Sequence, residues 1–294
     1  MLQSTDRFSF ASRFSLEPSL LLDLFVITNL GFLAFDIYLA HSMNNFRRPA
    51  EYIPLYFSIA APVFLGISLI MRRSHRRWWN VLGGTIGALA IAIGLAGVIF
   101  HLDSAFFYER TLRSLTYSAP FVAPLSYTGL GFLLIMNRMV KEDTLEWRQW
   151  ILLMAAGGFL GNFVLSLADH ATNGFFSVAE WVPVWASALA VGFLIAAIVL
   201  PPSRPFVHLC VGVLLGEGLV GVWGFILHAR ANLAGPSLHA FDNFVHGAPP
   251  FAPLLFPNLV LLGLLGFWRD AAGPHSFSNY APSAATHSSI SAGV

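Results

Sequence analysis

Eight apolar stretches recur along this chain of 294 residues, and each is long enough to cross a lipid bilayer. A helix needs about 20 residues to span the hydrocarbon core. The stretches are approximately 20–40, 52–71, 79–100, 118–138, 149–169, 181–200, 206–228 and 249–268. Because lipid cannot hydrogen-bond to the backbone, we expect all of them to be helical. With 56% hydrophobic and only 11% charged residues, the chain is predicted to be an all-α polytopic membrane protein with eight transmembrane helices.

The chain also repeats itself, mostly at an offset of 129 residues. Residues 41–58 and 170–187 share these identities: His41/His170, Asn44/Asn173, Phe46/Phe175, Ala50/Ala179, Glu51/Glu180, Pro54/Pro183 and Ser58/Ser187. Residues 118–125 are echoed by 247–254 in the same way. A glycine–histidine pattern recurs at the shorter offset of 127: Gly94, Gly97 and His101 against Gly221, Gly224 and His228. Such self-similarity indicates a duplicated structural unit.

Each copy of this unit would hold four helices. An even number of spans per copy predicts two parallel four-helix repeats related by a pseudo-two-fold axis along the membrane normal. We expect the first repeat at 1–138, a cytoplasmic linker at 139–148 and the second repeat at 149–270. The tail 271–294 is rich in Ser, Ala and Pro without an apolar period, and is predicted to be disordered.

Basic residues predict the orientation of the chain. The termini and the loops between spans 2–3, 4–5 and 6–7 hold these: Arg7, Arg13, Arg72, Arg73, Arg76, Arg77, Arg138, Lys141, Arg148, Arg204 and Arg269. The opposite side holds only Arg47, Arg48, Arg110, Arg113 and Arg230. Lys and Arg accumulate in cytoplasmic loops, so both termini are predicted to be cytoplasmic, with the bacterial inner membrane as the expected location. The lipid bilayer is the expected partner, and a net charge of +1 gives no reason to expect nucleic acid binding.

Histidines at one predicted membrane face give the strongest chemical signal. Four of them end the odd-numbered spans, and carboxylates accompany them: His41, His101, His170 and His228, with Glu51 and Glu180. Imidazole is a common metal ligand and a proton carrier near neutral pH. Nitrogen and carboxylate groups suit iron, zinc or copper(II), so a transition-metal site for one or two ions is predicted, with the glutamates as ligands or supporting partners. The alternative is that each histidine only caps its own helix terminus.

Helical spacing predicts which way two of these histidines point. Ala90, Gly94, Gly97 and His101 fall on one stripe of a helix, as do Glu217, Gly221, Gly224 and His228. Small residues let a neighbouring membrane helix approach closely, so both stripes are expected to face the bundle interior.

Glu217 is the carboxylate of the second stripe and replaces Ala90 of the first. A carboxyl group inside a membrane helix is expensive and usually faces a partner or a cavity. It is a candidate proton relay or inner metal ligand. The alternative is a neutral glutamic acid bonded to a neighbouring helix.

The last outer loop adds a third motif. His239, Asp242 and His246 are spaced by three and four residues, which would place them on one face of a helical turn. Two histidines and a carboxylate form a credible facial metal set, although amphipathic interfacial helices carry polar residues at the same intervals. The aligned residues of the first repeat are Arg110, Arg113 and Tyr117, so this set is not duplicated.

The repeated Ala-Pro-x-x-Ala-Pro-Leu segments are expected to open the fourth and eighth helices. Pro120 and Pro249 suit a first helical position. Pro124 and Pro253 stand four residues later and have no N–H, so the carbonyl oxygens of Pro120 and Pro249 should lack a helical partner. These oxygens are free to bind a ligand or water, or merely shape the helix entry.

Several functions stay open at this point. The favoured one is redox chemistry, sensing or transfer of a metal ion, and haem b held by one histidine pair is its variant. Proton- or ion-coupled transport using Glu217 is a second, and an accessory or scaffold subunit of a membrane complex, or a homo-oligomer, is a third. Enzyme status is undecided, since the chain has no P-loop, dinucleotide-binding, zinc-protease or hydrolase motif. Its single cysteine, Cys210, excludes an intramolecular disulfide and a Cys-rich metal site.

Overall fold

The computed structural model describes residues 17–71, 75–201 and 203–268. The predictions for the N-terminal segment, for the tail 271–294, and for Arg7, Arg13, Arg72, Arg73 and Arg269 lie outside these residues. Across the described ranges the chain is helical and contains no strand. The longer helices are α1 (Pro18–Ser42), α2 (Tyr52–Met71), α3 (Arg76–Leu102), α6 (Leu125–Met139), α7 (Leu145–Thr172), α8 (Trp181–Val199), α9 (Arg204–Leu233) and α11 (Leu255–Phe267). The short elements are η2 (Pro49–Glu51), α4 (Phe106–Glu109), α5 (Leu112–Thr116), η3 (Val178–Glu180), α10 (Ala240–His246) and η4 (Ala252–Leu254).

Six of the described helical segments are long and apolar enough to cross a membrane. They are Pro18–Ser42, Pro49–Met71, Arg77–Leu102, Leu145–Thr172, Val178–Val199 and Arg204–Leu233. Their outward side chains are large and apolar, for example Val63 and Ile67 on α2 and Leu219 on α9, each more than half exposed. Such a surface is stable only against lipid or another apolar surface. The prediction of a helical protein with membrane-spanning segments is confirmed to this extent.

The two remaining long helices start later than the sequence predicted. The stretches 118–138 and 249–268 were expected to be helical throughout, but α6 has 15 residues and α11 has 13. At 1.5 Å per residue, α6 is about 23 Å long, short of the roughly 30 Å of a hydrocarbon core. The prediction that Pro120 and Pro249 open these helices is therefore wrong. Closely spaced prolines remove backbone donors there, and the chain forms turns up to Pro124 and Phe251 instead.

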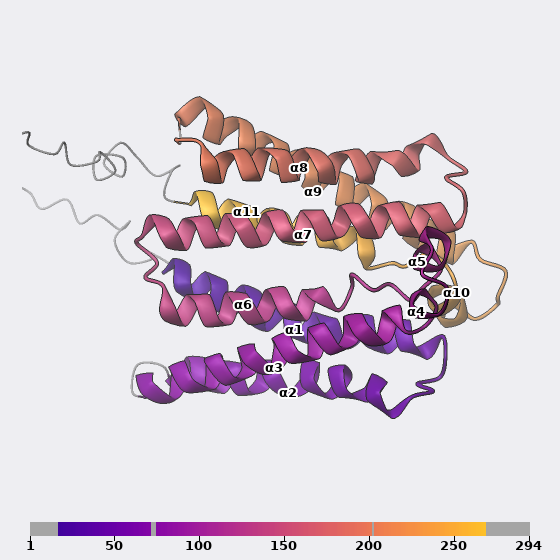
Figure 1. Ribbon diagram of the computed structural model, residues 1–294, viewed down its shortest axis with the longest axis horizontal. Helices are drawn as coiled ribbons and strands as arrows, with labels where there is room; N and C mark the ends of the chain where they lie inside the picture. Colours follow the sequence, from indigo (N-terminus) through magenta and orange to yellow (C-terminus); the bar gives the residue numbers. More distant parts are fainter. Residues whose placement is uncertain (1–16, 72–74, 202, 269–294) are drawn as a thin grey trace, which may run out of the picture.

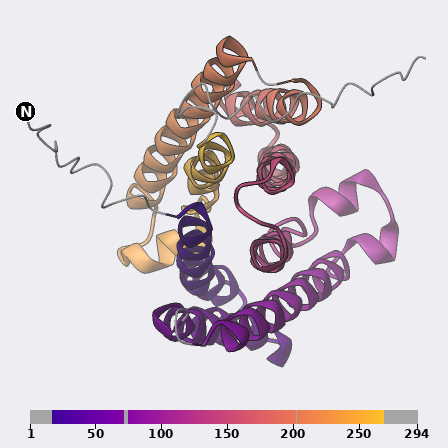
Figure 2. The same cartoon turned by 90° about the vertical axis from the view of Figure 1, so that its left-hand side faces the viewer.

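The helices lie side by side in one bundle (Figure 1). Seen end-on, α1, α6, α7 and α11 occupy the centre, with α2 and α3 on one side and α8 and α9 on the other (Figure 2). Contacts of α6 with α7 and of α1 with α11 join the first four long helices to the last four. Helices α1, α3, α7 and α9 all end at the end of the bundle where α4, α5 and α10 lie, which we call the α10 end (Figure 1).

Glycines of the two predicted stripes form the tightest helix contacts. A Cβ added at Gly94 of α3 would lie 2.8 Å from the carbonyl oxygen of Pro124, and one added at Gly97 would lie 2.7 Å from the Pro124 Cβ. In α9, a Cβ at Gly221 would lie 2.6 Å from the Phe256 Cβ. The prediction that these stripes face the interior is confirmed, since α3 packs on α6 and α9 on α11 through them.

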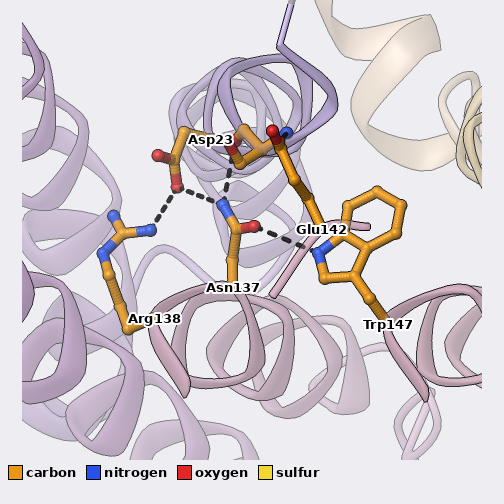
Figure 3. Close-up of polar contacts among 6 residues, drawn as sticks. Asp23, Asn137, Arg138, Glu142 and Trp147 are labelled. Carbon is orange, nitrogen blue, oxygen red and sulfur yellow. Dashed lines mark hydrogen bonds and ion pairs between the residues drawn. The ribbon is translucent and has the colours of Figure 1, made fainter. Parts of the chain in front are cut away.

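A buried polar network fixes the opposite end of the bundle (Figure 3). Arg138 Nη1 lies 2.6 Å from Asp23 Oδ1, and both side chains are at least 94% buried. Asn137 donates to the Ser19 carbonyl at 2.9 Å and to Asp23 at 3.0 Å, while Trp147 Nε1 donates to Asn137. These bonds join α1, α6 and α7.

The charged link between α6 and α7 takes part in the same network. The backbone N–H of Ser19, in the first turn of α1, donates to Glu142 Oε2 at 2.7 Å. A carboxylate is favoured at this position because the first helical N–H groups have no partner within the helix. The link predicted at 139–148 is therefore only 140–144 in the structure, and it anchors the start of α1.

Candidate functional site

His41, Glu51, His101 and Pro120 meet at the α10 end, and we call them the first cluster. His41 stands in the last turn of α1, and the 3₁₀ turn η2 brings Glu51 back towards it. His41 Nδ1 lies 3.5 Å from Glu51 Oε2. Asn44 supports the carboxylate by donating to its other oxygen at 3.2 Å.

His101 completes the first cluster from the last turn of α3. Its Nδ1 atom lies 2.9 Å from the carbonyl oxygen of Pro120. The ring centroids of His101 and His41 are 6.2 Å apart, with the ring planes at 76°. The oxygen that lacks a helical donor is thus used to hold a histidine, although it also accepts a turn hydrogen bond from Ala123 N at 3.1 Å.

The same arrangement occurs again in His170, Glu180, His228 and Pro249, the second cluster. His170 Nδ1 lies 3.4 Å from Glu180 Oε2, and His228 Nδ1 lies 2.8 Å from the Pro249 carbonyl oxygen. The two ring centroids are 6.4 Å apart at 80°. The chain therefore builds one histidine–glutamate–histidine group twice, with distances that agree within 0.2 Å. The structure brings the four histidines together as two pairs.

These contacts fix which ring nitrogen carries hydrogen. A carbonyl oxygen can only accept, so Nδ1 of His101 and of His228 must be the donor. Ionised carboxylates also only accept, which gives His41 and His170 the same tautomer. In a neutral imidazole the other nitrogen, Nε2, then keeps its lone pair. A histidine whose Nδ1–H is held by a carboxylate or a carbonyl is the usual form of a metal-binding histidine.

The glutamates of both clusters are short of hydrogen-bond donors. Among the described residues, Glu51 Oε2 and both oxygens of Glu180 are buried without a hydrogen-bond partner. The Glu180 side chain is 9% exposed, and the histidine contacts at 3.4–3.5 Å are longer than a charge-assisted hydrogen bond of about 2.7–2.9 Å. A buried carboxylate is costly unless positive charge compensates it, so each cluster has the charge of a cation site.

An aromatic stack borders each histidine, and the sequence analysis missed it. Phe46 and Phe175 adopt left-handed backbone conformations, with φ of 49° and 51°. Such angles are rare for bulky side chains and mark a local constraint. Phe46 stacks on Tyr52 at 4.7 Å and lies 5.8 Å from His41. Phe175 stacks on Trp181 at 4.1 Å, and its identity in both repeats was the signal available from the sequence.

The third predicted motif is only partly helical. His239 precedes α10 in an extended conformation, so the helix carries only Asp242 and His246 on one face. This corrects the prediction that all three share a helical face. Asp242 accepts from Ser237 Oγ at 3.2 Å, and all three candidate side chains are exposed. In the described ranges, no group of three or more His, Cys, Asp or Glu side chains is arranged to hold a metal ion.

Glu217 lies in the middle of α9 and is 3% exposed. Its Oε2 atom has no hydrogen-bond partner within the described part of the chain. It is one helical turn from Gly221, at the seam between α9 and α11. Glu217 is therefore an interior group away from both clusters, and the first-half counterpart Ala90 is equally buried.

Comparisons with protein-family models, with curated proteins and with solved structures found no match. Function therefore has to be inferred from the geometry of the chain itself.

Proposed function

We propose that this chain is a metal-handling membrane protein that binds one transition-metal ion at the histidine pair of each cluster. The observation that carries the proposal is the twofold occurrence of one arrangement: two histidines per cluster, each with its Nδ1 held and its Nε2 available. Iron, copper(II) and zinc are the ions that imidazole nitrogen suits. Such an ion supplies Lewis-acid or redox chemistry when bound.

The spacing of the rings supports this reading. A metal ion bound to two imidazole nitrogens at about 2.0–2.1 Å separates the ring centroids by roughly 5 to 6.5 Å. The observed 6.2 and 6.4 Å fall within that range. Glu51 and Glu180 contact Nδ1, so they orient the imidazoles and supply compensating negative charge.

Only two imidazoles converge in each cluster, which favours exchange over permanent storage. Structural zinc sites close all four positions with protein ligands, and catalytic sites use three. A pair leaves most positions to water or to a passing ligand. Acquisition or transfer of a metal ion therefore suits these clusters better than a structural role. Haem b between the histidines of a pair is the variant of this proposal, and absorbance near the Soret band distinguishes it.

The membrane arrangement belongs to the same proposal. Eight helices would lie in the bilayer as two related four-helix halves, with α6 and α11 as short, centrally placed members. Irregular backbone is tolerated at membrane depth when protein surrounds it, and α6 and α11 both pack inside the bundle (Figure 2). The basic residues favour termini on the cytoplasmic side of a bacterial inner membrane, with the α10 end outside.

Elemental analysis of detergent-purified protein tests the proposal. We expect wild type to hold metal and the His41→Ala/His170→Ala variant to lose most of it. His208→Ala is the matched control, because His208 is an exposed histidine near the start of α9 and outside both clusters. Equal metal content in wild type and the double variant would reject the clusters as metal sites.

Glu217 supports a second candidate function, proton-coupled transport. A buried carboxyl with an unpartnered oxygen at mid-membrane is the expected form of a proton-carrying group. Uptake into liposomes driven by a proton gradient should fall when Glu217 is replaced by Gln, which cannot release a proton. Uptake that survives Glu217→Gln would remove this candidate and leave the metal sites unaffected.

A further inference from the structure

A cavity of about 400 Å³ opens at the α10 end between the last turn of α1 and helix α10. Its lining includes Tyr38, Ser42 and Asn45 from the first half and Asp242 and His246 from the second. The two groups of residues are about two hundred positions apart in sequence, and the packing of α10 on α1 brings them together. The second half of the chain thus contributes polar groups beside the first cluster.

Two buried asparagines hold α10 in this place. Asn232, at the end of α9, donates to the Ala248 carbonyl and accepts from the Ala248 N–H, each at 2.8 Å. Asn243, within α10, bonds in the same two-sided way to the backbone of Ser237 at 3.0 Å. Side chains on an element fixed by four such bonds are positioned, so Asp242 and His246 belong to a built surface.

The cavity borders the first cluster directly. Phe46 lines it, and the Phe46 ring centroid is 5.8 Å from that of His41 and 6.1 Å from that of Tyr38. His41 lies on α1 between Tyr38 and Ser42, both of which line the cavity. Only the Phe46 side chain and the last turn of α1 separate the cavity from His41.

The lining has the chemistry of a cation pathway. A carboxylate, an imidazole, hydroxyl groups and an amide face it, and no Arg or Lys is among the residues that line it. Oxygen and nitrogen donors of this kind exchange readily with the water shell of a divalent transition-metal ion. Asp242 also supplies the negative charge that draws a cation towards a cleft.

The corresponding place beside the second cluster is different. There α5 packs on α7, and the cavity between them is only about 10 Å³. The positions 129 residues before Asp242 and His246 hold Arg113 and Tyr117, and the Arg113 guanidinium lies 6.0 Å from the Tyr117 ring. A cation would meet a positive charge and little space on this side.

We infer that the cavity between α1 and α10 is the entrance through which a hydrated divalent transition-metal ion reaches His41 and His101, with Asp242 and His246 as its first, transient ligands. The inference rests on the proposed metal-handling function. It makes the two clusters unequal, because only the first has a cation entrance of its own.

The test measures how fast metal-stripped protein takes Zn²⁺ from a fluorescent chelator. Two backgrounds isolate the clusters: His170→Ala/His228→Ala retains only the first, and His41→Ala/His101→Ala retains only the second. In the first background, Asp242→Asn/His246→Gln should slow loading at least about tenfold, the lower end of what charge steering contributes, and leave the final zinc content unchanged. In the second background the same change should leave the loading rate unaltered.

His239→Ala is the matched control, since His239 is an exposed histidine next to α10 that does not line the cavity. Unaltered loading in the first background would overturn the entrance while the metal sites stand. A lower final zinc content there would also overturn it, because Asp242 and His246 would then be resident ligands. Zinc binding in neither background would instead reject the proposed function itself.

Discussion

The Nδ1 atom of His228 lies 2.8 Å from the carbonyl oxygen of Pro249, and His101 holds the same position towards Pro120 at 2.9 Å. Each histidine ends one helix and each proline stands in the turn before the next. This bond ties two helices together and selects the ring tautomer that leaves Nε2 available. Structure and chemistry of the cluster therefore depend on a single contact.

Replacing His101 by Gln separates these two roles. The glutamine amide can donate to the Pro120 carbonyl but offers no imidazole nitrogen, so thermal unfolding should stay near wild type while the first cluster loses its metal. His101→Ala loses both, with an added cost of about 0.5–1.5 kcal/mol for the hydrogen bond. Thermal unfolding and elemental analysis check this. A Gln variant that keeps metal in the first cluster would show that His101 is not a ligand.

Gly94→Ala should force α3 away from α6. The new Cβ would lie 2.8 Å from the Pro124 carbonyl oxygen, and overpacking of this kind costs about 1–3 kcal/mol. Gly84→Ala in the same helix is the control, because a Cβ there meets nothing within 4 Å. It should be neutral or slightly stabilising, since alanine is the better helix former. Equal unfolding temperatures for the two variants would contradict the close contact at Gly94.

Arg138→Ala should be the most damaging surface-distant change at the opposite end of the bundle. It leaves Asp23 buried without its ion-pair partner, which costs about 3–5 kcal/mol. Lys141→Ala, an exposed cation of the neighbouring link, should change stability little. The apolar pair Asp23→Leu/Arg138→Met should recover most of the loss, because the second half has Leu152 and Phe267 at the aligned positions. Urea or thermal unfolding in detergent measures all three.

The sequence could predict the parts of the site that are local or repeated. Helical spacing placed Gly94, Gly97 and His101 on one interior face, and the repeat singled out Glu51 and Glu180. Length alone did not reveal that α6 and α11 start late, because the prolines that shorten them lie within apolar stretches. The pairing of His41 with His101 depends on how α1 meets α3, which no local pattern specifies.

The buried Asp23–Arg138 pair and the placement of α10 were also out of reach of sequence reasoning. Both depend on contacts between residues more than 100 positions apart. Phe46 carried a signal in its repetition, but its left-handed backbone and its stack on Tyr52 appear only in the folded chain. Polar positions that differ between the halves, such as Asp242 against Arg113, had their significance set by the cavity beside them.

Metal stoichiometry measured cluster by cluster tests the central claim most directly. The account predicts two metal ions per wild-type chain, one ion in His41→Ala/His101→Ala, one in His170→Ala/His228→Ala, and none when all four histidines are replaced. Wild-type protein that binds no iron, copper or zinc would contradict it, and so would a full complement of metal in the fourfold variant.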